Sequence, residues 1–180
     1  MSAPLFFSTF EVSTQAFYRT ALSYAIVNLK PIVPGHVLVV PTRVVPRLTD
    51  LTTPELTSLI TSVQNVGRVI EKAYDADSLT VACQDGKAAG QSVPHVHFHV
   101  LPRRFKGDYF SERMDDIYPA LERSEASLPQ YLLDANRVDG QFQPLKVDAD
   151  DSRPPRSLAD MERETDWLRT FFAHNPHHDS

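Results

Sequence analysis

The sequence predicts an α+β protein: an antiparallel sheet of about five strands, a helix packed on one face, and a C-terminal helix. Three observations support this fold class. Short segments rich in aromatic and β-branched residues flank one long amphipathic segment. The connections between the early segments are short, which favours antiparallel pairing. The 180 residues are enough for one domain with a core of its own.

The predicted elements follow one another along the chain. The strands are expected at 5–12, 16–20, 23–29, 36–42, 78–84 and 95–101. Between the fourth and fifth strands, apolar side chains recur every three to four residues, which predicts a helix over 54–74. That stripe consists of Leu56, Leu59, Ile60, Val63, Gly67, Ile70 and Tyr74. Thr52 and Glu55 form a capping box at its start. Another helix is expected over 158–172, capped by Ser157.

The organisation of the chain predicts one domain in three parts. Residues 1–120 hold the motifs that carry chemistry and are expected to form the catalytic part. Residues 121–156 combine many charges and scattered prolines with little periodicity, so a flexible loop or insertion is expected there, most clearly over 147–156. Residues 157–180 are expected to return to the same domain as a helix and tail.

Composition excludes several classes of partner. The net charge of −5 argues against a nucleic-acid-binding surface, which needs clustered lysine and arginine. No apolar run approaches the ~20 residues that span a bilayer, so no membrane association is expected. Cys83 is the single cysteine, so no internal disulfide can form and a reducing compartment is expected, the cytoplasm and also the nucleus.

The most informative segment is a run of three alternating histidines, His95, His97 and His99. Side chains alternate across a strand, so the three imidazoles share one face while the valine and phenylalanine residues between them share the other. Three interpretations stand: a solvated strand face, a zinc site, or a nucleophile with its positioning groups. For zinc, residues four apart in a strand lie about 13 Å from each other, so a third ligand such as His36 is needed.

The nucleophile interpretation agrees with the chemistry of phosphoryl transfer, which needs positioning and charge stabilisation more than acid–base catalysis. An imidazole with a pKa near ~6.5 is largely neutral at pH 7. Backbone N–H groups around Gly90 and Ser92 can form an anion-binding nest. A leaving nucleotide is already a stable anion, so no carboxylic acid is expected beside the histidines.

The segment 91–100 (QSVPHVHFHV) resembles the histidine triad (HIT) signature, in which histidines alternate with apolar residues. Segments 28–39 (NLKPIVPGHVLV) and 78–86 (SLTVACQDG) resemble the ribose-binding region of the Fhit branch of that superfamily. The resemblance covers about residues 5–120. It implies that His97 is the nucleophile, with Nδ1 held by the backbone carbonyl of His95. The other implied site residues are His99, Gln91, Asn28, Gln84, Ser92, His36 and Phe6.

The resemblance also implies an activity, the hydrolysis of dinucleoside polyphosphates. P1,P3-diadenosine triphosphate would give AMP and ADP through a covalent nucleotidyl-histidine intermediate. A homodimer with joined sheets is implied, as is a divalent cation, Mg²⁺ or Mn²⁺, that accompanies the substrate without a metal site on the protein. Two alternatives remain open: a Hint-like nucleoside phosphoramidase, and a nucleotide-binding signalling protein in which hydrolysis is slow.

Overall fold

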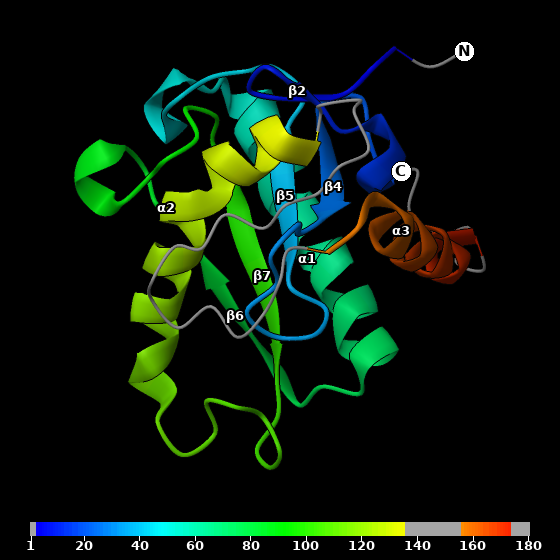
Figure 1. Ribbon diagram of the computed structural model, residues 1–180. Coiled ribbons are helices and arrows are strands. Elements are labelled where there is room, and N and C mark those ends of the chain that lie inside the picture. Colours follow the sequence, from blue (N-terminus) through cyan, green and yellow to red (C-terminus); the bar gives the residue numbers. More distant parts are fainter. Residues whose placement is uncertain (1–2, 136–155, 174–180) are drawn as a thin grey trace.

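The computed structural model describes residues 3–135 and 156–173, and it confirms the α+β fold (Figure 1). Five antiparallel strands form the main sheet in the order β3-β4-β5-β7-β6. The strands are β3 (Ala16–Arg19), β4 (Ser23–Val27), β5 (Val37–Pro41), β6 (Ser78–Ala82) and β7 (Phe98–Arg103). The helices are α1 (Thr53–Tyr74), α2 (Ile117–Ala135) and α3 (Leu158–Ala173). None of the helices in these two described ranges is long and apolar enough to cross a membrane.

Strand β5 is the central strand of the sheet and pairs with β4 on one side, and every residue in both strands is buried. Their register pairs Ala25 with Val39, so small and β-branched side chains face each other across the strands. Helix α1 packs on β4, β5 and β7. These central strands agree with the segments that the sequence predicts, each shortened by one or two residues at its ends.

Helix α1 begins where the capping box predicts. The Thr52 side chain accepts from the Glu55 amide, and the Glu55 carboxylate accepts from the Thr52 amide at 2.8 Å. Its buried face is rotated from the predicted stripe, however, because Leu56 and Ile60 are 40% and 48% exposed. Ser62 is buried instead, since its hydroxyl lies 2.7 Å from that of Ser23 on β4 and so has a hydrogen-bond partner.

The predicted single strand over 5–12 is wrong, because the segment folds back on itself. Two short strands, β1 (Phe6–Phe7) and β2 (Phe10–Glu11), pair with each other as a separate hairpin. Ser8 adopts a positive φ of 56° at its turn. The apolar composition of the segment is explained by Leu5, Phe7 and Val12, which enter the core on either side of that turn.

Strand β7 starts three residues later than predicted, at Phe98, and continues to Arg103. Before it, the chain is held in an irregular extension, in which the His95 amide donates to the Val93 carbonyl at 2.8 Å. The faces of β7 alternate as expected. Val100 packs in the cluster that contains the α1 side chains, while Leu101 packs in a second cluster with residues of α2. His99 therefore shares the α2 side of the strand with Leu101.

Helix α2 corrects the predicted loop over 121–156, because residues 121–135 are helical. Its buried positions Ile117, Leu121 and Leu128 recur at helical spacing. Ile117 and Leu121 pack on Val33 and Leu101, which lays the helix across the front of the sheet in Figure 1. The rest of that predicted loop, including nearly all of 147–156, lies outside the described residues.

Helix α3 confirms the expected C-terminal helix and its cap. The Ser157 hydroxyl accepts from the Asp160 amide at 3.1 Å. Met161 and Leu168 are fully buried. The helix packs beside α1 and against β3, so it covers one edge of the sheet (Figure 1).

Candidate active site

The three histidines of the motif lie where the chain enters β7, under helix α2. All three are at most 1% exposed, so this is an interior polar cluster rather than a solvated strand face. A buried imidazole needs hydrogen-bond partners, and each of the three has a different set. Those partners determine which ring nitrogens carry protons.

His97 is held at both nitrogens. Nδ1 donates to the His95 carbonyl at 2.7 Å, the contact that the resemblance implies. Nε2 lies 3.3 Å from Oε2 of Glu125, and since a carboxylate only accepts, Nε2 also carries a proton. Burial disfavours the charged ring, but the Glu125 carboxylate outweighs burial and raises the pKa of His97. His97 is therefore an imidazolium in this state.

Glu125 of α2 brings a carboxylate directly against the histidines, where the sequence predicts none. It is 1% exposed. Burial alone would raise its pKa, yet the contacts with His97 lower the pKa to about 2. Its second oxygen, Oε1, accepts from the Ser92 amide at 3.2 Å. The expectation of a site without a carboxylic acid is thus wrong for the described state.

His99 belongs to a chain of polar groups that continues through His36, the residue before β5. The Ile32 amide donates toward Nδ1 of His36 at 3.4 Å, so we assign the proton of His36 to Nε2. That nitrogen lies 2.9 Å from Nδ1 of His99, which then accepts. Nε2 of His99 is left as a donor, without a hydrogen-bond partner among the described residues and 3.7 Å from the Glu125 carboxylate. Burial lowers the pKa of both rings, that of His36 to about 3, so both are neutral.

His95 faces the backbone rather than the carboxylate. Its Nδ1 accepts from the Ser8 amide at 3.0 Å, and its Nε2 donates to the Pro41 carbonyl at 2.9 Å. Burial lowers the pKa of His95 to about 4, which keeps the ring neutral. Phe7 stacks on His95 and meets His97 edge-on, with ring centroids 5.7 and 5.2 Å away. The neighbouring Phe6, which the resemblance implies as a site residue, is 40% exposed.

The glycine-bearing loop before the histidines carries three of the predicted site residues. Gln91 is buried and donates to the Pro46 carbonyl at 2.9 Å, so its amide is engaged in this state. Ser92 contacts Glu125 as described above. Gln84 packs against Gly90, and its buried Oε1 has no hydrogen-bond partner within the described part of the chain. That oxygen is available to a ligand that brings a donor.

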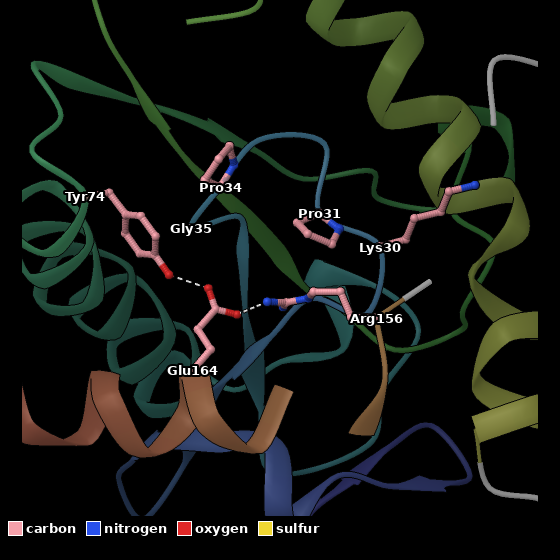
Figure 2. Close-up of a pocket in the computed structure, with 7 residues that line it drawn as sticks. All are labelled: Lys30, Pro31, Pro34, Gly35, Tyr74, Arg156 and Glu164. Carbon is pink, nitrogen blue, oxygen red and sulfur yellow. Dashed lines mark hydrogen bonds and ion pairs between the residues drawn. The ribbon is translucent and has the colours of Figure 1, made fainter. Parts of the chain in front are cut away.

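Asn28, the predicted ribose contact, lies at a corner that α1 and α3 support. Its side-chain oxygen accepts from the Lys30 amide at 3.0 Å, and its Nδ2 donates to Nδ1 of His36 at 3.3 Å, which agrees with the proton of His36 on Nε2. Arg156 donates to the Asn28 carbonyl. Figure 2 shows the same guanidinium joined to Glu164, which in turn accepts from the Tyr74 hydroxyl.

A cavity of about 420 Å³ opens at this corner. It is lined by Lys30, Pro31, Pro34, Gly35, Tyr74, Arg156 and Glu164. None of these described lining residues is a triad histidine. The cavity is therefore separate from the histidine cluster.

Metal binding was one of the interpretations of the histidine run. Among the described residues, the ligand atoms close enough for one ion belong to His97, His99 and Glu125, within 4.8 Å of one another. His36, the third ligand that the sequence suggests, is hydrogen-bonded to His99 instead. Two imidazoles and one carboxylate suit zinc and do not suit Mg²⁺, which prefers oxygen ligands. In the described state the same atoms form an ion pair.

Sequence reasoning missed Glu125, although a signal was present. Ile117, Leu121 and Leu128 follow a helical stripe, and residue 125 lies on the same face, one turn after Leu121. The prolines at 119 and 129 and the high charge of the segment hid that stripe.

Comparisons with known proteins agree with this geometry. Residues 9–106 match the HIT domain family. The chain is 50% identical over 179 residues to a Schizosaccharomyces pombe protein named bis(5'-nucleosyl)-tetraphosphatase [asymmetrical], covering 96% of this chain and 97% of that one. It is 51% identical over 147 residues to the Arabidopsis thaliana bifunctional bis(5'-adenosyl)-triphosphatase/adenylylsulfatase FHIT, covering 81% and 78%.

The fold itself is found in a solved structure of diadenosine triphosphate hydrolase from Plasmodium falciparum. The TM-score is 0.69 at 22% identity, over 97% of this chain and 88% of that one, which supports the fold alone. The matched domain spans more than half of the chain and contains all three histidines. The chain therefore belongs to the HIT domain family.

Proposed function

We propose that this chain hydrolyses dinucleoside polyphosphates through a covalent nucleotidyl-histidine intermediate on His97. The observation that carries the proposal is that two hydrogen-bond donors, the Ser92 amide and Nε2 of His99, lie close to Nε2 of His97. The Ser92 amide and Nε2 of His97 already hold the Glu125 carboxylate there, and Nε2 of His99, which has no hydrogen-bond partner among the described residues, lies 3.7 Å from that carboxylate. A phosphoryl group presents the same kind of acceptor oxygens. The names of the relatives agree with this substrate class.

The proposed reaction has two displacements. Once Nε2 of His97 has lost its proton to solvent, its lone pair attacks phosphorus and the bond to the leaving nucleotide breaks. The His95 carbonyl holds Nδ1–H, so the ring stays oriented as it becomes positively charged. His99 and the Ser92 amide stabilise charge on the phosphoryl oxygens. Water then attacks the same phosphorus and releases the mononucleotide from His97.

The length of the preferred polyphosphate is the finer part of the proposal. We propose P1,P3-diadenosine triphosphate, cleaved to AMP and ADP, as the preferred substrate, although one close relative is named for tetraphosphates. A panel of diadenosine triphosphate, diadenosine tetraphosphate, adenylyl sulfate, AMP-lysine and capped dinucleotides tests this. The highest kcat/KM is expected for the triphosphate. A preference for AMP-lysine would instead indicate a nucleoside phosphoramidase, and tight binding with very slow turnover would indicate a signalling role.

Gln84 offers a direct test of substrate contact, because its side-chain oxygen has no hydrogen bond to lose among the described residues. We expect Gln84→Ala to raise KM about threefold to tenfold with little change in kcat, as for loss of a hydrogen bond of ~0.5–1.5 kcal/mol. Asn28→Ala should raise KM similarly and also lower stability, since the Asn28 side chain holds the Lys30 amide. Unchanged steady-state kinetics in both variants would remove these residues from the site.

Three accompanying features are also proposals. A divalent cation, Mg²⁺ or Mn²⁺, would travel with the phosphates of the substrate and shield their charge, because phosphate oxygens are ligands that both ions accept. A homodimer would form through the outer edge of β6, the last strand of the sheet, where Val81 is 45% exposed. The cation dependence of turnover and the molecular mass in solution test these two. A cytoplasmic or nuclear location, inferred from the single cysteine, stays a prediction.

A further inference from the structure

The Glu125 carboxylate occupies the position in which the proposed reaction needs a phosphoryl group. It reaches that position because α2 is laid on the sheet by Ile117 and Leu121, and residue 125 follows one turn later on the same face. Both carboxylate oxygens have partners. Oε1 accepts from the Ser92 amide at 3.2 Å, and Oε2 accepts from Nε2 of His97 at 3.3 Å.

A second contact of the same residue ties the helix to the loop. Pro129 has no N–H, so the helix cannot satisfy the carbonyl of residue 125, four positions earlier. The Ser92 hydroxyl takes that place and donates to the Glu125 carbonyl. Ser92 therefore binds Glu125 through backbone and side chain together. The proline also leaves the helix with one fewer internal hydrogen bond at the point where it covers the histidines.

The donors that hold the carboxylate can serve only one anion at a time. An incoming phosphoryl group needs the Ser92 amide, and its phosphorus must come within bonding reach of Nε2 of His97. Neither is possible while Glu125 is in place. His97 also cannot act as a nucleophile in this state, because its Nε2 lone pair binds the proton that it donates to the Glu125 carboxylate.

We propose that Glu125 is an intramolecular competitor of the substrate phosphate, and that α2 must withdraw its carboxylate before a nucleotide can bind. The inference rests on the proposed function, since it names a control on the same site. Withdrawal exposes the phosphoryl donors and frees His97 to lose the Nε2 proton to solvent. After hydrolysis, the returning carboxylate competes with the mononucleotide product and favours its release.

The strength of this competition depends on how stably α2 holds the Glu125 carboxylate against Ser92 and His97. The first half of α2 stays anchored by its apolar contacts with Val33, Leu101 and Phe110. The part around residue 125 depends on the Ser92 contacts, the ion pair with His97 and the buried Leu128. An anion that replaces Glu125 restores the partners of His97 and Ser92, so the exchange needs no unpaired buried charge.

The test measures binding of AMP, the expected product, by isothermal titration calorimetry. Glu125→Gln keeps the size of the side chain and removes its charge, while Glu125→Ala removes the competitor entirely. Glu122→Gln is the matched control, because Glu122 is exposed on the same helix, one turn before. We expect both Glu125 variants to bind AMP about tenfold or more tightly than wild type, the effect of losing a competing charge-assisted hydrogen bond, with the control unchanged.

Two further readouts separate competition from a purely structural role. Saturating AMP should accelerate hydrogen exchange of the amides around residue 125 in the wild-type protein, and the KM of the Glu125→Gln variant for diadenosine triphosphate should fall in parallel with its AMP dissociation constant. Equal AMP affinity in wild type and both Glu125 variants, or no AMP binding by any of them, would overturn the inference. Absence of hydrolysis across the substrate panel would refute the proposed function separately, since the AMP titrations do not depend on turnover.

Discussion

Replacing His97 with alanine is expected to lower kcat by several orders of magnitude, on the order of 10⁴ or more, the loss seen when a covalent nucleophile is removed. The reason is that neither of the other two triad histidines can take its place. His95 uses both ring nitrogens on backbone groups, and Nδ1 of His99 is bonded to His36. Single-turnover assays with diadenosine triphosphate measure the loss directly, without interference from product release.

Binding provides the control for this variant. The Ser92 amide and the His99 donor remain, so His97→Ala should still bind AMP, and the loss of the ion pair should make Glu125 easier to displace. Thermal unfolding then verifies that the variant is folded. A variant that stays within about tenfold of the wild-type kcat would contradict a nucleophilic role for His97 and return the histidines to binding alone.

Gly35→Ala is expected to cause a large loss of stability. Gly35 has a φ of +81°, and a Cβ there would lie 2.6–2.8 Å from the ring of Tyr74. A left-handed alanine costs about 1–2 kcal/mol, and overpacking against a core side chain adds about 1–3 kcal/mol. We therefore expect the free energy of unfolding to fall by about 2–5 kcal/mol in urea denaturation.

Gly107→Ala is the matched control for the backbone part of this effect. Gly107 has nearly the same φ, +80°, but a Cβ there would meet nothing within 4 Å. The control should lose only about 1–2 kcal/mol, so the difference between the two variants measures the clash with Tyr74. Equal losses would show that the turn can move away from α1. Because Gly35 precedes His36, we also expect its variant, and not the control, to lose activity.

The regular parts of the fold could be predicted because local pattern and tertiary environment agree there. The segments for β4 and β5 are apolar in sequence and buried on both faces in the sheet. The capping box of α1 is a local arrangement of Thr52 and Glu55, so its geometry follows from four consecutive residues. The orientation of His97 agrees with what the family resemblance implies, because its Nδ1 is held by the His95 carbonyl.

The remaining features depend on contacts that the chain makes over long distances. Ser62 is buried because Ser23, on another element, offers a hydroxyl, and no local pattern indicates that. The hairpin around Ser8 depends partly on His95, which lies 87 positions further along the chain and accepts a hydrogen bond from the Ser8 amide. The apolar stripe of α2 places Glu125 on a buried face, but its partner His97 lies 28 residues earlier in the chain, so no local pattern indicates the pairing.

The central claim is that His97 forms a bond to phosphorus, and the stereochemical course of hydrolysis tests it most directly. A diadenosine triphosphate analogue made chiral with sulfur and oxygen isotopes at the attacked phosphorus is hydrolysed in isotopically labelled water, and the configuration of the released nucleotide is determined. Displacement by His97 and then by water inverts the phosphorus twice, so the account predicts net retention. Net inversion would mean that water attacks directly and that His97 never becomes covalently bound.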